Sequence, residues 1–131
     1  LLTPTYHVFD LYKVHQHAAL LDSRIISSTI GFSEMPVEDL YESAAIDSDG
    51  SVHVTICNVD PHQSKTIDAE LIGFVPRSLV GDILSGEMKD HNTFSCKDCV
   101  HVVPFSAVSI TPTGFTATLP PCSVVRISAK P

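Results

Sequence analysis

The chain has 131 residues, of which 44% are hydrophobic and 18% are charged. This composition can bury one core of ordinary domain size and excludes an intrinsically disordered chain. Eight Lys and Arg residues against fifteen Asp and Glu residues give a formal net charge of −7, and the basic residues are scattered. We therefore expect no nucleic-acid partner. No run approaches the roughly 18 to 20 apolar residues of a membrane span, so we expect no membrane partner either.

The start of the chain lacks the basic and apolar regions of a secretory signal, so a cytoplasmic location is expected. Thr3 can cap a helix, and Pro4 suits a first helical position. Apolar residues then recur at three-to-four spacing at Val8, Leu11, Tyr12, His15, Ala18 and Ala19. This pattern predicts one amphipathic helix over about residues 4 to 20. No initiating Met precedes the helix, so we expect residue 1 to lie inside a longer protein.

Both the helical and the strand periodicities are lost after Asp22. The segment contains Gly31, Pro36 and the acidic pair Glu38-Asp39, which interrupt regular structure. Connections of this length usually cross between layers or domains. We therefore divide the chain into a helical segment 1–22, an irregular connection 23–40 and a β-rich domain 41–131.

The clearest strand pattern begins at Val52. Val52, Val54 and Ile56 alternate with more polar positions, which predicts a strand with one buried face. The turn residues 48–50 before it predict a hairpin with residues 44–47. A second turn is expected over residues 58–64, around Asp60-Pro61.

Further short runs continue to the end of the chain. They cover residues 67–71, 79–84, 100–103, 107–110, 115–119 and 124–127. About eight strands at roughly ten-residue spacing, with Gly, Pro and Asp between them, are typical of an antiparallel sandwich or jelly roll. The expected fold is therefore mainly β: an antiparallel jelly-roll-like β-sandwich with one N-terminal amphipathic helix.

The most conspicuous local motif is Cys96-Lys97-Asp98-Cys99, flanked by His91 and His101. Such a turn can supply two thiolates to zinc, with histidine completing the site, or it can form a disulfide. The other two cysteines, Cys57 and Cys122, stand alone at strand ends. We favour reduced cysteines, keep the disulfide and the zinc site as alternatives, and expect no metal and no cofactor.

A catalytic acid and base would require two carboxylates held at a defined separation. The sequence-adjacent acids Glu38-Asp39 and Asp47 with Asp49 lie in predicted turns, where we interpret them as turn formers and solvated charges. No nucleophile elbow, phosphate-binding glycine loop or zinc-protease helix motif occurs. By these criteria the chain contains no catalytic, substrate-binding or metal-binding residue of its own.

A free-standing carbohydrate-binding module is the alternative that a small β-sandwich raises. Sugar-binding faces commonly present exposed aromatic rings, but Trp is absent and aromatic residues make up only 7% of the chain. We expect most of Phe74, Phe94, Phe105 and Phe115 in the core or at strand ends.

Several segments together resemble one enzyme family. They are residues 2–9 (LTPTYHVF), 12–16 (YKVHQ), 49–54 (DGSVHV), 58–61 (NVDP), 91–94 (HNTF), 103–105 (VPF) and 119–125 (LPPCSVV). In this order they are similar to the C-terminal part of family 51 α-L-arabinofuranosidases. The resemblance runs over nearly the whole chain and is weakest at residues 25–40.

The resemblance implies that residues 1–22 are the terminal helix of a (β/α)₈ catalytic barrel and residues 41–131 its C-terminal domain. Enzymes of this family are retaining and exo-acting, and release terminal arabinofuranose from arabinan, arabinoxylan or their oligosaccharides. Their two catalytic Glu residues lie at barrel strand ends. This chain lacks the Asn-Glu signature, so no catalytic residue is carried over, and the implied role is accessory, structural and oligomer-forming.

Four residues within the matched segments receive an interpretation on the same basis. His91 and Asn92 either shape the approach to a sugar site on the barrel or satisfy local backbone groups. Tyr6 and His7 would lie near the active site of an intact enzyme, although we expect packing roles for them.

The resemblance also bears on association. We expect the apolar stripe of the helix to be covered by barrel neighbours and therefore to be free in this chain. The family's jelly roll resembles one that is completed by chain from the enzyme's N-terminus, which would leave a free sheet edge here. Homo-oligomerisation or association with the catalytic barrel is expected.

Overall fold

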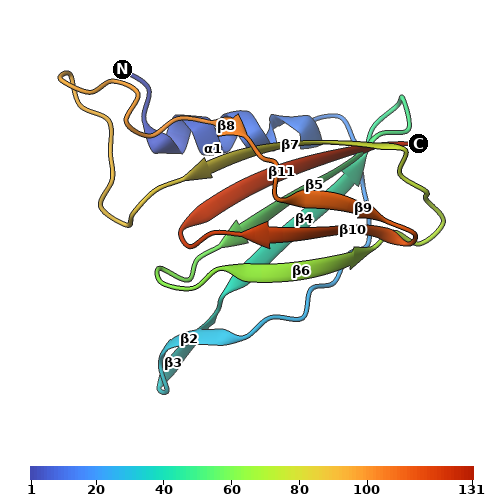
Figure 1. The fold of residues 1–131 in the computed structure, drawn as a ribbon, viewed down its shortest axis with the longest axis horizontal. Coiled ribbons are helices and arrows are strands. Elements are labelled where there is room, and N and C mark those ends of the chain that lie inside the picture. The colour runs from blue at the N-terminus through green and yellow to red at the C-terminus, as the bar shows by residue number, and fades with distance from the viewer.

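The computed structural model describes all 131 residues and contains two packed sheets covered on one side by a helix (Figure 1). The larger sheet has the order β1-β4-β5-β11-β7-β8, and the smaller sheet has the order β6-β10-β9. All strand pairs in both sheets are antiparallel. The expectation of a mainly β, antiparallel jelly-roll-like sandwich with one N-terminal helix is confirmed.

The strands of the larger sheet are β1 (Ala19–Leu20), β4 (Leu40–Ile46), β5 (Val52–Asn58), β7 (Ser78–Ser85), β8 (Val103–Pro104) and β11 (Ser123–Lys130). Those of the smaller sheet are β6 (Lys65–Glu70), β9 (Val108–Thr111) and β10 (Gly114–Leu119). The predicted strand at residues 100–103 is reduced to the two residues of β8.

The core lies between the two sheets, where alternate residues of each strand point inward. Val125 and Ile127 of β11 and Phe115 of β10 are buried there. Phe105 also joins this core, as expected, whereas Phe74 is half-buried. Phe94 is the exception among the four Phe residues, with 84% of its side chain exposed, because it lies in a long loop that has no inward face.

The helix is shorter than the sequence pattern predicts. α1 spans Pro4–Tyr12, and Thr3 caps it by accepting a hydrogen bond from the Tyr6 amide, 3.2 Å. A short 3-10 helix, η1 (Lys13–His15), follows. His17 then adopts a φ of 60°, a left-handed conformation that ends the helical path and turns the chain into β1. The apolar pattern continues through Ala19, but that residue pairs with Ile46 of β4 instead.

The apolar stripe of the helix is covered within the chain itself. Leu11 is fully buried with Leu84 and Val100, and Val8 and Tyr12 pack against this cluster. The expectation that the stripe is free is therefore wrong. The outward positions of β7 and β11 form a second apolar surface, so the larger sheet carries a core on each face.

The sequence predicts an irregular connection over residues 23–40, whereas the structure contains a hairpin there. β2 (Thr29–Phe32) pairs with β3 (Met35–Glu38). Gly31 takes a φ of +94° within it. Figure 1 shows the hairpin projecting from the sandwich, on the far side of β6 from α1. Its apolar residues, Phe32, Met35 and Val37, are exposed.

Candidate functional site

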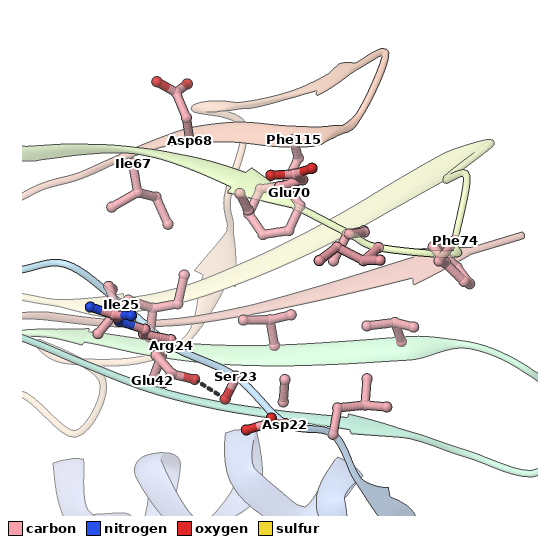
Figure 2. A pocket seen from close by; sticks show the side chains of 18 residues that line it. Asp22, Ser23, Arg24, Ile25, Glu42, Ile67, Asp68, Glu70, Phe74 and Phe115 are labelled. Atoms are coloured by element: carbon pink, nitrogen blue, oxygen red, sulfur yellow. Dashed lines mark hydrogen bonds between the residues drawn. The ribbon is translucent and has the colours of Figure 1, made fainter.

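A groove opens between the two sheets at one side of the sandwich (Figure 2). Its volume is about 550 Å³, and twelve of its eighteen lining residues are hydrophobic. In Figure 2, Ile67 and Phe115 reach into the groove from the smaller sheet, and Glu42 lies on the opposite wall. The groove exists because the smaller sheet covers only part of the larger one.

The polar groups of the groove lie along its rim. Ser23 donates a hydrogen bond to the Glu42 carboxylate, 2.5 Å, which ties the segment after β1 to β4. Figure 2 shows the Asp68 carboxylate turned away from the apolar interior. The arrangement can bind an apolar segment, and the Ser23–Glu42 pair at the rim fastens the segment after β1 to the sheet.

One wall of the groove ends in an edge strand, β6. β6 pairs with β10 on one side and lies at the edge of the smaller sheet on the other. Leu71 donates its N–H to the Thr113 carbonyl, 2.8 Å, which sets the alternation of this ladder. The N–H groups of Thr66, Asp68 and Glu70 consequently point to the free edge. A free edge beside an apolar groove can accept another strand.

Three charged residues hold this side of the domain together. Lys65 of β6 lies 2.9 Å from the carboxylate of Asp39 and 3.3 Å from that of Asp60. Asp39 also accepts a hydrogen bond from the Ser28 amide, 2.9 Å, and is fully buried. The interpretation of Asp39 as a solvated turn charge is therefore wrong. Hydrogen bonding to Asp39 raises the pKa of Lys65, and backbone donation from His62 lowers the pKa of Asp60.

A second polar network lies on the opposite face of the larger sheet. His53 bonds through Nε2 to the Asp47 carboxylate, 2.6 Å, and through Nδ1 to the Ser128 hydroxyl, 2.8 Å. Hydrogen bonding to Asp49 and then to His53 lowers the pKa of Asp47 to about 2. Sequence reasoning missed this network, although a polar His in a strand beside an Asp-rich turn is a usable signal.

The Ser128-His53-Asp47 series has the residue types of a hydrolase triad. The groove does not include any of the three. Asp47 accepts from the backbone amides of Asp49 and Ser51 as well, 3.1 and 3.3 Å. We therefore interpret the network as the fastening of the β4–β5 turn to β11.

The long loop between β7 and β8 covers residues 86–102 and contains His91 and Asn92. The Asn92 side chain donates to the Val100 carbonyl, 2.7 Å, and accepts from the Val100 amide, 2.7 Å. His91 is exposed and donates from Nδ1 to the Lys89 carbonyl, 3.0 Å. Both side chains thus satisfy backbone groups, as one of the two interpretations proposed.

Tyr6 and His7 lie on α1. The two rings meet edge to face at 5.6 Å, and half of the Tyr6 surface is exposed. His7 Nε2 is buried without a hydrogen-bond partner. The structure brings neither residue into the groove.

The cysteines fall into two pairs. Cys96 and Cys99 form a disulfide, so the preference for reduced thiols at this motif is wrong and the disulfide alternative is confirmed. Cys57 and Cys122 are free and line a second cavity of about 380 Å³ near the start of α1. Burial raises the pKa of Cys57, and its sulfur lies 3.8 Å from the Tyr12 hydroxyl.

No group of three or more His, Cys, Asp or Glu side chains is arranged to hold a metal ion. No helix combines the length and apolar character that crossing a bilayer requires.

The fold and the groove define a class of protein: a β-sandwich domain with a covering helix and an open apolar side. A family model described as the alpha-L-arabinofuranosidase C-terminal domain matches residues 1–123. The chain belongs to this family, so the resemblance of its sequence motifs is confirmed.

Individual relatives agree with this assignment. The intracellular exo-alpha-L-arabinofuranosidase of Bacteroides ovatus is 30% identical over an aligned length of 131 residues. The match covers 98% of this chain and 26% of the relative. The crystal structure of the family 51 arabinofuranosidase of Xanthomonas axonopodis pv. citri matches 99% of this chain and 27% of its own, with a TM-score of 0.94 and 29% identity.

A more distant relative shows the same fold. The family 51 α-L-arabinofuranosidase AbfB of Bifidobacterium longum matches with a TM-score of 0.82 and 20% identity, over 98% of this chain and 26% of its own. The chain spans about a quarter of the length of these relatives.

Proposed function

We propose that this chain is the accessory C-terminal domain of a retaining, exo-acting α-L-arabinofuranosidase. In this proposal, the helix within residues 1–22 is the terminal helix of the catalytic barrel, residues 23–40 are the connection, and residues 41–131 form the sandwich, to which β1 also belongs. Both catalytic Glu residues lie outside the chain, and arabinose-containing oligosaccharides are bound by the enzyme as a whole. The name of the Bacteroides ovatus relative supports a cytoplasmic location.

The observation that carries the proposal is the open groove beside the free edge of β6. An apolar groove of about 550 Å³ exposes hydrophobic side chains to water, which is energetically unfavourable and marks a contact surface. In the proposed enzyme, chain from elsewhere in the protein adds a strand to β6 and fills the groove. The domain thereby braces the catalytic barrel instead of acting on substrate.

A second surface supports contact with the barrel. Leu1, Leu2, Tyr6 and Phe9 are exposed at the start of the chain and on the outer side of α1, with 74% of Phe9 accessible. The inner side of α1 is already used for packing on the sheet. The outer side is therefore the part of the helix that can meet the barrel or a second subunit.

An activity assay tests the accessory role. The chain alone is expected to leave a chromogenic arabinofuranoside intact, because both catalytic Glu residues of the proposed enzyme lie outside it. Hydrolysis by the purified chain would overturn the proposal. Retention of the chain on insoluble arabinan or xylan would instead favour a carbohydrate-binding module.

A variant in the free edge tests the docking role. We expect the chain to form dimers, or to bind the remainder of the enzyme, in size-exclusion chromatography with light scattering. Asp68→Pro removes an outward N–H of β6 without touching the ladder to β10, so association should weaken. Asp68→Ala removes the same carboxylate, retains the N–H and is the matched control. A chain that stays monomeric and does not bind the rest of the enzyme would contradict the proposal.

A further inference from the structure

The loop between β7 and β8 contains a small closed ring. Asn92 bonds to both backbone groups of Val100, so residues 92–100 form a ring that one side chain closes. The same Asn92 amide donates to the Leu2 carbonyl, 2.8 Å. The ring therefore holds the first residues of the chain in addition to itself.

The ring is also tied to the packing under α1. The Val100 side chain is buried against Leu11 and Leu84. A change in the order of residues 92–100 consequently acts on two contacts of the N-terminal segment: the bond to Leu2 and the packing of Leu11.

The disulfide lies inside this ring. Cys96 and Cys99 have Cα atoms 5.6 Å apart, and both residues are exposed. Thiol–disulfide exchange requires a thiolate to approach one of the two sulfurs, and exposure permits that approach. Cys57 is half-buried and its pKa is raised, so little of its thiol is present as the thiolate that would attack this disulfide.

We propose that Cys96 and Cys99 form a reversible redox site, which takes a dithiol as reductant and whose state sets the order of residues 92–100 and of Leu2. A thiolate of the dithiol attacks one cysteine sulfur, the protein S–S bond breaks, and the released cysteine thiolate takes up a proton. The second thiolate of the dithiol then attacks the reductant's own sulfur in the mixed disulfide. The bond to the protein breaks, the reductant's disulfide forms, and the second cysteine leaves as a thiolate that takes up a proton. The protein gains two electrons and two thiol protons, and the dithiol becomes a disulfide.

The physical effect follows from the loss of the covalent link. The disulfide restricts the conformations of residues 96–99, and its reduction gives this part of the ring more freedom. The hydrogen bonds that Asn92 makes to Val100 and Leu2 then hold a looser loop. In a cytoplasm, where thiols are abundant, disulfides of this kind are characteristically transient or redox-sensing. The chemistry at the pair does not depend on the proposed enzyme function.

Thiol counting tests the exchange. The chain is equilibrated with oxidised glutathione, denatured and alkylated with iodoacetamide; mass spectrometry should show adducts on Cys57 and Cys122 alone. Brief native treatment with dithiothreitol before denaturation should give adducts on all four cysteines. The Cys96→Ser/Cys99→Ser double variant should give the first pattern under both conditions. Four adducts without reductant, or two after it, would overturn the proposal.

Hydrogen exchange tests the coupling to the ring. The Val100 amide, which donates to Asn92, should exchange roughly twofold to tenfold faster after reduction, the range that loss of one hydrogen bond's net stabilisation implies. In Asn92→Ala, this amide should exchange fast in both redox states. Amides of β10 serve as an internal reference. If the exchange rate of the Val100 amide in the unaltered chain did not change on reduction, the coupling would be refuted.

Discussion

At the scale of single residues, the buried carboxylate of Asp39 contributes to stability only as long as its polar partners are present. It is fully buried, and its compensation comes from the Ser28 amide and the Lys65 ammonium group. A buried charge without its partner destabilises a fold strongly, whereas removal of both partners costs much less. The Asp39–Lys65 pair thus fastens the segment before β4 to the edge strand β6.

We predict that Lys65→Met lowers the urea midpoint of unfolding more than Lys97→Met does, because Lys97 is exposed in the disulfide loop. The double variant Asp39→Asn/Lys65→Met should recover part of the loss. Unfolding followed by circular dichroism measures all three. Equal midpoints for Lys65→Met and Lys97→Met would show that the pair contributes nothing.

The pKa of Asp47 leads to a prediction about acid. Because its pKa falls from 3.8 to about 2 on folding, the unfolded chain binds this proton more readily than the folded chain. Asp47 therefore contributes stability above about pH 4, and this contribution disappears as the pH falls towards 2. Asp47→Asn should show a shallower loss of stability over that window in urea titrations at several pH values. Asp68→Asn, a change at an exposed carboxylate, should keep the slope of the unaltered chain.

At the scale of elements, α1 shows what its two sides contribute. Leu11 is fully buried and Phe9 is 74% exposed on the same helix. We predict that Leu11→Ala destabilises the chain by about 2 to 5 kcal/mol, the usual cost of removing a buried Leu side chain. Phe9→Ala should change stability by no more than about 0.5 kcal/mol, since it removes no internal packing. Urea unfolding of the two variants gives the comparison. Similar values for both would mean that α1 does not dock on the sheet.

The elements also show how far sequence reasoning reaches. The strands after residue 44 could be predicted because alternation, as at Val52, Val54 and Ile56, reflects one face buried in a core. The hairpin of β2 and β3 could not, because its apolar residues, such as Phe32 and Met35, are exposed and form no alternating pattern against a core. The early end of α1 was missed because its apolar positions continue into β1, which uses them for sheet pairing.

The candidate site divides in the same way. The Cys96/Cys99 motif and the role of Asn92 as a backbone partner were visible in sequence, because both involve short separations along the chain. The groove and the Asp39–Lys65 pair were not, because they join segments that only the folded sheets bring together. The free edge was expected from the family resemblance, and β6 could be identified as that edge only once the strand order was known.

At the scale of the whole molecule, the last strand is the one on which the others depend. β11 lies between β5 and β7 in the larger sheet, pairing with both along its length. Its inward residues Val125 and Ile127 are fully buried in the main core, and Val124 on the other face packs under α1. One strand therefore joins the two sheets and the helix.

This position predicts that the chain cannot fold without β11. Truncation after Cys122 removes β11, leaves β5 and β7 without a common partner and opens both cores. The shortened chain should therefore lack the cooperative unfolding transition and the dispersed NMR spectrum of the full 131-residue chain. Truncation after Ala129 retains the pairs up to that residue with β5 and β7 and should keep a cooperative transition. A folded, cooperative chain ending at Cys122 would show that the helix and the remaining strands are sufficient, and that the central place of β11 is not what makes the molecule a single unit.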